Sequence, residues 1–358
     1  MIRKLSSDVE RILEAGNTAP SGENCQPWRF VVREEVIEIH LLPERDKSAY
    51  SWGQRAAFLA AGAVIENMVV EASARKYRAD VAYFPERGGE WHVADIVLHK
   101  DTSIAADPLA AYITRRITNR KPYAKQPLTN SERAALFAAA AQVGSKLAFI
   151  EERRNIDRLG RVGSTNEQVM LANRALHNFF FSHVSWTKEE DERKKVGFYI
   201  KTLELPVPAE AMFKMFRHWP IMRILVAIGF NRVVARQNGT TNAAAAGVGA
   251  LMIEGVEPLD FVKVGRAMER LWLVAATHGL SFQPLTGVLF FKLKIEAGGD
   301  TIFSPDEKKL IMDAYRDASR ICNAGGKHIA FMFRIGHGDA PSAHAVRFPL
   351  EAVVTMAS

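Results

Sequence analysis

The chain has 358 residues, 48% hydrophobic and 24% charged, which suffices for two domains of average size with ordinary cores. The net charge is +7, but the basic residues are scattered along the chain and form no nucleic-acid-binding motif, so we expect no nucleic-acid partner. The ten histidines do not have the spacing of metal ligands, so we expect no bound metal. No stretch reaches the roughly 18 apolar residues of a membrane span, and no signal peptide is evident, so we expect no membrane partner. The two cysteines, Cys25 and Cys322, form no disulfide framework, which favours a cytoplasmic protein.

Helical and strand patterns alternate along the chain without strict βαβ order. Apolar periodicity predicts helices over residues 7–16, 54–75, 131–142 (capped by Ser131), 154–181, 210–237 (an amphipathic pair), 258–278 and 306–323. Apolar runs predict strands over residues 28–32, 36–41, 92–99, 147–150, 247–254, 286–294 and 329–335. The charge run 188–196 is typical of a solvated face. This mixture predicts an α+β fold, with long helices packed on mixed or antiparallel sheets.

Two of the predicted helices resemble each other. Phe58–Glu66 aligns with Phe261–Glu269 at a constant offset of 203, with phenylalanine, glycine and glutamate matched. Any two amphipathic helices share some letters, but ungapped matches of this kind favour an internal duplication. We therefore expect two related halves, residues 1–112 and 113–358.

The turn-rich segment Ala19–Trp28 (APSGENCQPW) is the most informative part of the chain. Its hydroxyl and amide side chains can donate and accept hydrogen bonds, and its glycine lets the backbone approach a ligand closely. A capped turn leading into a strand would use the same residue types. The segment resembles the A-P-S-x-x-N-x-Q-P-W signature of the FMN-dependent nitroreductases. The residues that this resemblance assigns to a flavin site are Ser21, Gly22, Asn24, Gln26 and Trp28.

Three later segments also resemble nitroreductase motifs. The run 115–123 is similar to the R-x-[ST]-x-[KR] run that holds the FMN phosphate, for which arginine forks are suited. Residues 279–287 resemble the turn whose backbone faces the flavin N5 edge, with threonine where glutamate is frequent; an ordinary helix-to-strand turn is the alternative. The tail, residues 334–350, resembles the C-terminal phosphate segment, with Ala345 where lysine is frequent. The residues so assigned to FMN are Arg116, Thr118, Arg120, Pro284, Thr286, Gly287 and Arg347.

The resemblance implies a nitroreductase-like fold, and the distribution of the motifs implies one asymmetric site. The first half holds the 20–28 loop without a phosphate run. The second half holds the phosphate run, the turn and Arg347, but reads Ala141–Leu147 where its own loop would lie. We expect one FMN per chain at the seam between the halves of a pseudo-dimer, as in the Acg-type branch of the superfamily. Residues 185–237 would form a lid over the flavin or, equally, a helical packing element.

The implied activity is flavin chemistry without a catalytic side chain. NAD(P)H would reduce FMN, which would pass electrons to a nitro, quinone or enone acceptor, in a monomer or weak homodimer. One alternative is a storage protein that holds FMN under the lid, which the threonine at position 286 mildly favours. Another is a small-molecule-binding protein that has lost its flavin, against which the phosphate-site residues argue.

Overall fold

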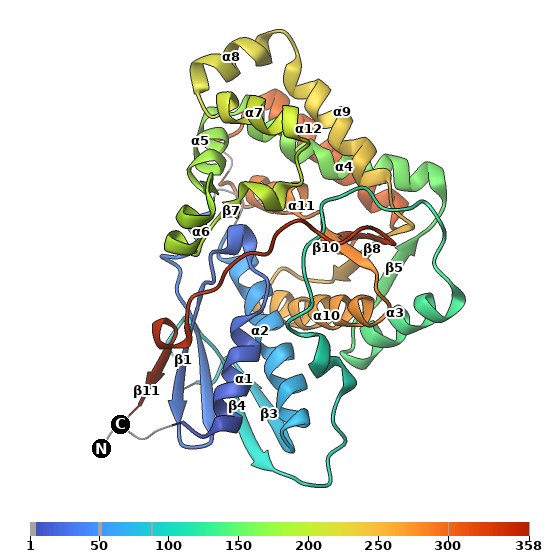
Figure 1. The fold of residues 1–358 in the computed structure, drawn as a ribbon. Coiled ribbons are helices and arrows are strands. Elements are labelled where there is room, and N and C mark those ends of the chain that lie inside the picture. Colours follow the sequence, from blue (N-terminus) through green and yellow to red (C-terminus); the bar gives the residue numbers. More distant parts are fainter. Residues whose placement is uncertain (1–4, 49–51, 87–88, 300, 358) are drawn as a thin grey trace.

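The computed structural model describes residues 5–48, 52–86, 89–299 and 301–357 (Figure 1). Its α-helices are α1 Ser7–Asn17, α2 Arg55–Ala74, α3 Asn130–Gln142, α4 Arg153–Ala172, α5 Arg174–Ser182, α6 Lys188–Lys194, α7 Val207–Phe216, α8 Trp219–Ala227, α9 Phe230–Ala243, α10 Pro258–Thr277, α11 Gly287–Glu296 and α12 Pro305–Ile321. Its strands are β1 Trp28–Arg33, β2 Val36–Leu41, β3 Tyr77–Tyr83, β4 His92–Lys100, β5 Leu147–Ile150, β6 Val184–Ser185, β7 Phe198–Tyr199, β8 Gly247–Ile253, β9 Ser281–Pro284, β10 His328–Gly336 and β11 Val354–Met356. Short 3-10 turns are η1 Gly22–Asn24, η2 Pro108–Tyr112, η3 Ile200–Leu203 and η4 Leu350–Ala352.

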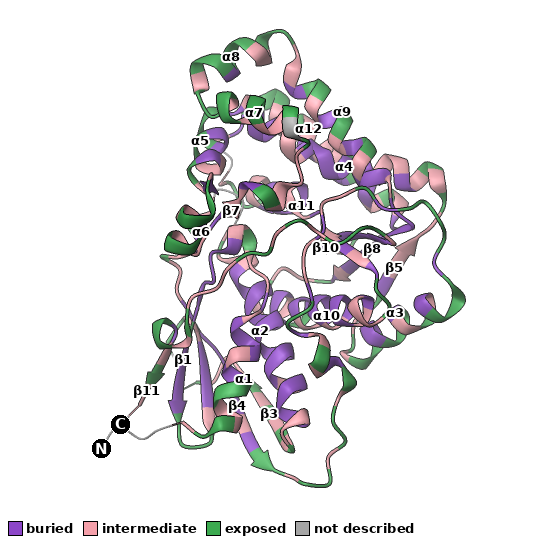
Figure 2. Ribbon diagram, in the orientation of Figure 1, coloured by how far each residue is buried: buried purple, intermediate pink, exposed green. Residues whose placement is uncertain are grey.

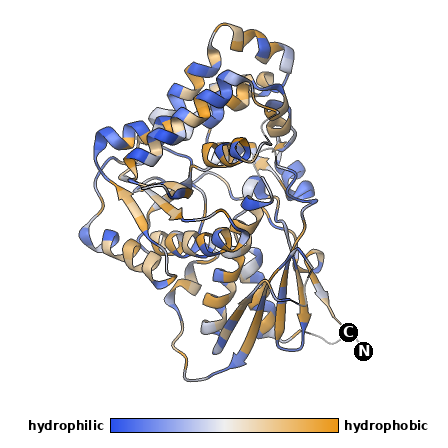
Figure 3. Cartoon of the chain, turned by 180° about the vertical axis from the view of Figure 1, so that it is seen from behind, coloured by the Kyte–Doolittle hydropathy of each residue, from blue (hydrophilic) through white to orange (hydrophobic). Residues whose placement is uncertain are grey.

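Among the described residues, the strands form two main sheets, each packed on a long helix. The first sheet has the order β11-β1-β2-β4-β3 and packs on α2, and the second has the order β5-β8-β10-β9 and packs on α10. All pairs in these two sheets are antiparallel except β1 with β11. Strands and central helices are largely hydrophobic and buried (Figures 2 and 3). The expected α+β fold with antiparallel and mixed sheets flanked by long helices is confirmed.

The two helices that aligned in sequence cross each other at their glycines. A Cβ placed on Gly62 would lie 2.0 Å from the carbonyl oxygen of Val262, and one placed on Gly265 would lie 1.9 Å from that of Leu59. Gly62 and Gly265, like Leu59 and Val262, are related by the offset of 203. Contacts that exchange equivalent residues in this way are the mark of an isologous, two-fold interface. The sequence repeat therefore corresponds to a pseudo-two-fold contact, and we call the α2–α10 interface the seam.

The C-terminal segment crosses the seam. After β10 of the second sheet, the chain runs back past α2 and ends as β11, paired in parallel with β1 of the first sheet (Figure 1). The first sheet is thus completed by residues from the far end of the sequence. The expected division at residue 112 stays a prediction, and this strand-pairing shows that a simple cut there would separate two bonded strands.

Several sequence expectations need correction. The apolar run 286–294 is helix α11 rather than a strand, because a fully buried run carries no periodicity that distinguishes the two. The cap of α3 is Thr129, which forms a capping box with Glu132, not Ser131. The predicted helix 154–181 is broken at Asn173, whose side chain caps α5, and the predicted pair over 210–237 is three helices. Strand β3 was missed, although its alternating exposure matches its alternating sequence.

One described helix, α2, is long and apolar enough to cross a membrane by length and composition alone, contrary to the expectation from the sequence. In the structure, 83% of its apolar window is buried inside the protein. Gly62 lies in the middle of this helix, where the other long helix covers it. The helix is therefore apolar because it lies between a sheet and the seam.

Candidate functional site

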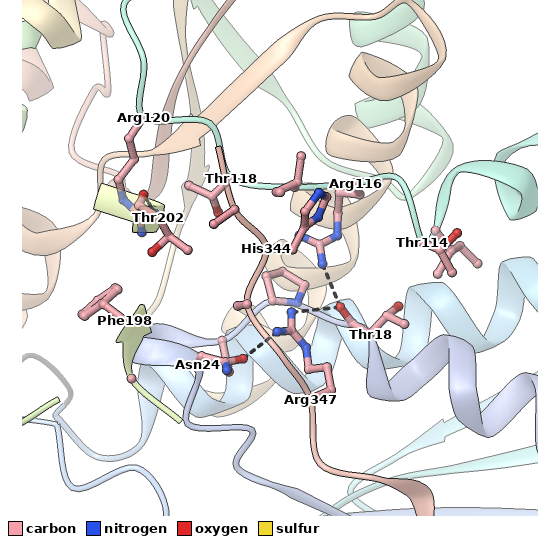
Figure 4. A pocket seen from close by; sticks show the side chains of 17 residues that line it. Thr18, Asn24, Thr114, Arg116, Thr118, Arg120, Phe198, Thr202, His344 and Arg347 are labelled. Atoms are coloured by element: carbon pink, nitrogen blue, oxygen red, sulfur yellow. Dashed lines mark hydrogen bonds between the residues drawn. The ribbon is translucent and has the colours of Figure 1, made fainter. Parts of the chain in front are cut away.

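A cavity of about 220 Å³ lies beside the seam and gathers side chains from both halves (Figure 4). Six of the residues predicted for the FMN site line it, together with residues of the C-terminal tail and of the segment 197–202. The lining residues are Thr18, Pro20, Ser21, Asn24, Ile113, Thr114, Arg116, Ile117, Thr118, Arg120, Gly197, Phe198, Thr202, Ala343, His344, Ala345 and Arg347.

The buried Arg116 and the half-buried Arg347 converge at one end of the cavity. Arg116 donates from Nη2 to the carbonyl oxygen of Thr18 (2.7 Å), and Arg347 donates from Nη2 to the same oxygen (3.2 Å). Arg347 also donates from Nη1 to Oδ1 of Asn24 (2.6 Å). Figure 4 shows both guanidinium groups pointing toward Thr18. A single peptide oxygen therefore holds two cations from distant parts of the chain beside each other.

The charge balance around this pair is positive. Nε of Arg116 lies 2.8 Å from Oε1 of Glu269, whose side chain is fully buried on α10. Burial raises the pKa of Glu269 to about 7, against the opposing effect of Arg116. Burial and the charge of Arg116 lower the pKa of Arg347 to about 9. Nε of Arg347 is buried without a hydrogen-bond partner among the described residues. Two guanidinium groups thus share one carboxylate, and its raised pKa means that the ionised form of this carboxylate is disfavoured.

Arg120 lies farther along the cavity wall. Its Nη1 donates to the carbonyl oxygen of Thr202 (2.9 Å), and its guanidinium stands over the ring of Phe198, 5.5 Å from the centroid. Burial lowers its pKa. Thr118 lies between Arg116 and Arg120 and forms an isolated parallel bridge with Phe282 in β9. The predicted phosphate run therefore passes along the cavity, which Arg116, Ile117, Thr118 and Arg120 all line.

The 20–26 loop is held against segment 195–198 by polar contacts. Asn24 and Gln26 both donate to the carbonyl oxygen of Lys195, at 3.0 and 2.7 Å, and the amide of Gly197 donates to the carbonyl oxygen of Glu23 (2.6 Å). A Cβ on Gly197 would lie 2.0 Å from the carbonyl oxygen of His183, so the segment needs glycine at this close approach. Of the segment predicted as a lid, Gly197, Phe198 and Thr202 line the cavity, and no residue of α7, α8 or α9 does.

Three predicted residues of the loop do not line the cavity. Gln26 is fully buried and joins the loop to the tail, accepting from the amide of Phe348 (2.7 Å). Trp28 is fully buried in the first core and donates to Oδ1 of Asn17 (3.0 Å). Gly22 is exposed in η1. Gln26 and Trp28 therefore hold the loop in place instead of facing the cavity. Only part of the motif lines the cavity for this reason.

The predicted turn at 284–287 also lies outside the cavity lining. Pro284 pairs with Phe333 in the sheet, and Thr286 is the N-terminal cap of α11. A Cβ on Gly287 would lie 2.3 Å from Oδ1 of Asn166, so the amide of Asn166 occupies the space in front of this turn. Next to it, burial raises the pKa of Glu167, which Arg120 opposes. Asn166 Oδ1 and Glu167 Oε2 are buried without a hydrogen-bond partner among the described residues.

The sequence reasoning missed several residues of the site. Glu269 was present in the repeat alignment, and a charged residue at the centre of a buried helix face was the available signal. Gly197, Phe198 and Thr202 had no sequence signal, because tertiary packing alone brings them to the cavity.

Comparisons with known proteins fit this geometry. No family model matches the chain. An uncharacterized protein of Mycobacterium tuberculosis (strain CDC 1551 / Oshkosh) is 25% identical over 346 residues, 93% of this chain and 46% of the relative. A putative NAD(P)H nitroreductase of Mycobacterium tuberculosis (strain ATCC 25618 / H37Rv) is 29% identical over 164 residues, 46% of each chain, and the putative NAD(P)H nitroreductase acg is 31% identical over 125 residues, 33% of this chain and 37% of the relative. These matches span about half of the relatives' length or less.

Solved structures of nitroreductases are also similar at low identity. The FMN-dependent nitroreductase NfnB from Mycobacterium smegmatis, in complex with NADPH, matches 70% of this chain and 98% of its own, at 10% identity and a TM-score of 0.39. A nitroreductase with bound FMN from Bacteroides fragilis matches 68% and 96%, at 10% identity and a TM-score of 0.35. The sequence relatives among the putative NAD(P)H nitroreductases support the resemblance to the nitroreductase-like superfamily that the motifs implied.

Proposed function

We propose that the chain binds one FMN in the seam cavity and uses it for NAD(P)H-dependent oxidoreduction. The observation that carries this proposal is the convergence of the predicted residues. Ser21 and Asn24 come from the first half, residues 116, 118 and 120 from the start of the second, and Arg347 from the tail, yet all line one cavity. Relatives named putative NAD(P)H nitroreductases support the choice of reductant.

The donor set suits the phosphate of FMN. Arg347 presents a buried Nε–H without a hydrogen-bond partner among the described residues, and Nε of Arg116 lies 2.8 Å from the Glu269 carboxylate, whose pKa is raised. A dianionic phosphate would accept from such N–H groups through charge-assisted, bidentate hydrogen bonds. It would also remove the cost of holding Arg347 buried beside Arg116. The phosphate would therefore be held by these two arginines, with Thr118 and Arg120 farther along.

Polar atoms near Arg120 suit the rest of the cofactor. Buried acceptors without partners are uncommon in folded proteins and frequently mark the place of a ligand or water. Asn166 Oδ1 and Glu167 Oε2 are such acceptors, and they lie between Arg120 and the 284–287 turn. When bound, FMN supplies the hydride and electron chemistry, and the chain's residues bind it, orient it and exclude water.

The cavity is smaller than a whole cofactor requires. Its volume of about 220 Å³ lies below the roughly 300 Å³ at the lower end of ligand pockets. The covering residues 195–202 are attached to the loop by the contacts of Lys195 and Gly197, so entry of FMN requires this segment to shift outward. The same cover favours a second candidate function, storage of FMN without turnover, because it restricts the approach of a reductant.

The surroundings of the residue that corresponds to Glu269 in the other copy of the repeat support one cofactor per chain. Glu66 corresponds to it at the offset of 203 and is also fully buried. It is paired with Arg266 (2.8 Å) and Arg270 (2.7 Å) from α10. Arg270 further donates to Gln142 (2.7 Å) and pairs with Asp107 (2.6 Å). Side chains therefore fill the pseudo-equivalent site.

The visible spectrum of the purified chain tests the proposal. We expect a yellow protein that releases one FMN per chain on denaturation and that bleaches when NADPH is added without oxygen. A yellow protein that does not bleach would establish storage instead. A colourless protein that takes up no added FMN, or a firm stoichiometry of two, would refute the proposed site.

Arginine variants test the position of the phosphate. Arg347→Ala removes charged hydrogen bonds worth about 1.5–3 kcal/mol, so FMN affinity should fall by about 10- to 150-fold. Arg116→Lys should weaken affinity while keeping a cation beside Glu269. Arg115→Ala is the matched control, because Arg115 is the exposed neighbour in the same run and carries the same charge. An equal effect of all three variants, measured by flavin fluorescence titration, would place the phosphate elsewhere.

A further inference from the structure

The helices α7, α8 and α9 form an apolar and basic projection at the end of the molecule farthest from the first sheet (Figure 1). Six of the exposed large hydrophobic side chains lie here, and among the described residues only Phe137 is exposed to this degree elsewhere. They are Met212 (49% exposed), Met215 (55%), Ile221 (36%), Ile224 (65%), Ile228 (76%) and Val233 (62%). Figure 2 shows much of α7 and α8 as exposed, whereas α9 has one exposed and one buried side.

These side chains are not the inner face of the helices. Met222 of α8 is fully buried, and Phe213, Phe216, Trp219 and Phe230 pack on the second core. Ile221, Ile224 and Ile228 follow one another at intervals of three and four residues, so they lie along one outward stripe of α8. A surface helix ordinarily presents polar residues on that side. The projection is therefore fixed to the protein by one apolar face and presents a second to its surroundings.

The charge of the same region is mainly positive, because Glu210, which pairs with Lys201 and Lys214, is its only acidic residue. No aspartate or glutamate occurs between Glu210 and Glu254, whereas the stretch holds five cations. All five are exposed: Lys214, Arg217, Arg223, Arg232 and Arg236. Arg223, Arg232 and Arg236 make no ion pair with any residue that the structure describes. Isoleucines surrounded by unpaired arginines are a poor surface for a second copy of the chain, because two such patches would repel each other.

We propose that the α7–α9 projection docks on an anionic phospholipid surface. An interfacial helix buries an apolar face at the boundary of headgroups and acyl chains while its basic residues meet the anionic headgroups. Ile224, Ile228 and Met215 would enter the boundary, and the five cations would contact phosphate. The helices are far too short to span, so the protein lies on the surface. This inference is independent of the flavin proposal and departs from the expectation of no membrane partner.

Flotation of the full chain with vesicles tests the proposal. We expect binding to vesicles of phosphatidylcholine with phosphatidylglycerol, weak binding to phosphatidylcholine alone, and loss of binding as salt screens the charges. The double variant Ile224→Ser/Ile228→Ser and the double variant Arg223→Gln/Arg232→Gln should each weaken binding by about tenfold or more. Phe137→Ser and Arg115→Gln are matched controls, exposed side chains of the same kinds outside the projection.

Three outcomes would overturn the proposal. One is absence of wild-type binding to the anionic vesicles. Another is binding by the isoleucine and arginine variants as tight as that of the controls. The third is a concentration-dependent dimer, seen in sedimentation, that the isoleucine variants lose, because a second copy would then be the occupant. All the substituted side chains are exposed, and an unchanged thermal unfolding midpoint will show that the variants fold.

Discussion

The crossing of α2 and α10 makes a quantitative prediction for the glycines at its centre. Alanine at position 62 would place Cβ 2.0 Å from a backbone oxygen, and alanine at position 265 would place it 1.9 Å from one. Overpacking of a core costs about 1–3 kcal/mol, and a backbone group cannot swing aside as a side chain can. Alanine gains about 1 kcal/mol over glycine in a helix interior. We therefore expect Gly62→Ala and Gly265→Ala each to destabilise the chain by about 2 kcal/mol.

The two variants should also be coupled. Both alanines would push the helices apart at the same crossing. Once the helices have separated to accommodate one alanine, the second alanine costs less additional free energy. The double variant should lose less than the sum of the single losses, as residues in contact commonly do. Urea unfolding gives the midpoints, and Gly89→Ala is the control, since nothing lies within 4 Å of its added Cβ. Neutral single variants, or a large loss at only one of the two positions, would refute the pseudo-two-fold contact.

Two further predictions concern buried charge. Glu66→Ala would leave Arg266 and Arg270 without their buried partner, so we expect the free energy of unfolding in urea to fall by about 3 kcal/mol or more. A fall smaller than the one caused by removing a partner of an exposed pair, such as Arg11 with Glu14, would contradict this prediction. Burial and the neighbouring Asp46 raise the pKa of Glu23 from 4.5 to about 8, so the folded chain binds a proton that the unfolded chain releases. Stability should therefore fall as pH rises from about 4.5 to about 8, and Glu23→Gln should flatten this fall in thermal unfolding scans. Parallel profiles for the two proteins would count against the raised pKa.

The motifs predicted the part of the site that short stretches of sequence determine. Arg116, Thr118 and Arg120 belong to one short run that passes along the cavity. Ser21 and Asn24 reach the same cavity because η1 brings them onto one side of a turn. Arg347 was predicted only by resemblance, and no local pattern could show that its guanidinium would share a carbonyl with Arg116.

The part that could not be predicted depends on pairing between distant segments. Nothing in the spacing of residues 354–356 indicates that they join the first sheet. In the same way, pairing of β2 with β4 brings ligand-type atoms of Glu38, His40 and His92 within 4.8 Å of one another. In the structure these groups form hydrogen bonds with each other or with Arg33 and Asp95. Such clusters arise from sheet register, which a sequence pattern constrains only weakly.

The asymmetry of the seam has a specific physical origin in two positions of the repeat. Arg266 and Arg270, which neutralise Glu66, correspond at the offset of 203 to Ala63 and Asn67. Glu269 therefore meets only the amide of Asn67 across the seam, and cations of the cavity must provide its counter-charge.

The consequence is a difference in net charge between two otherwise related places. Around Glu66, two arginines of the seam and the carboxylate of Asp107 complete a closed network. Around Glu269, the two guanidinium groups of Arg116 and Arg347 exceed the single carboxylate, and Nε of Arg347 has no hydrogen-bond partner among the described residues. A buried excess of positive charge is costly unless an anion joins it. The absence of arginine at positions 63 and 67 thus leaves an excess of positive charge at one of the two related places, and there the motifs that resemble phosphate-binding segments converge.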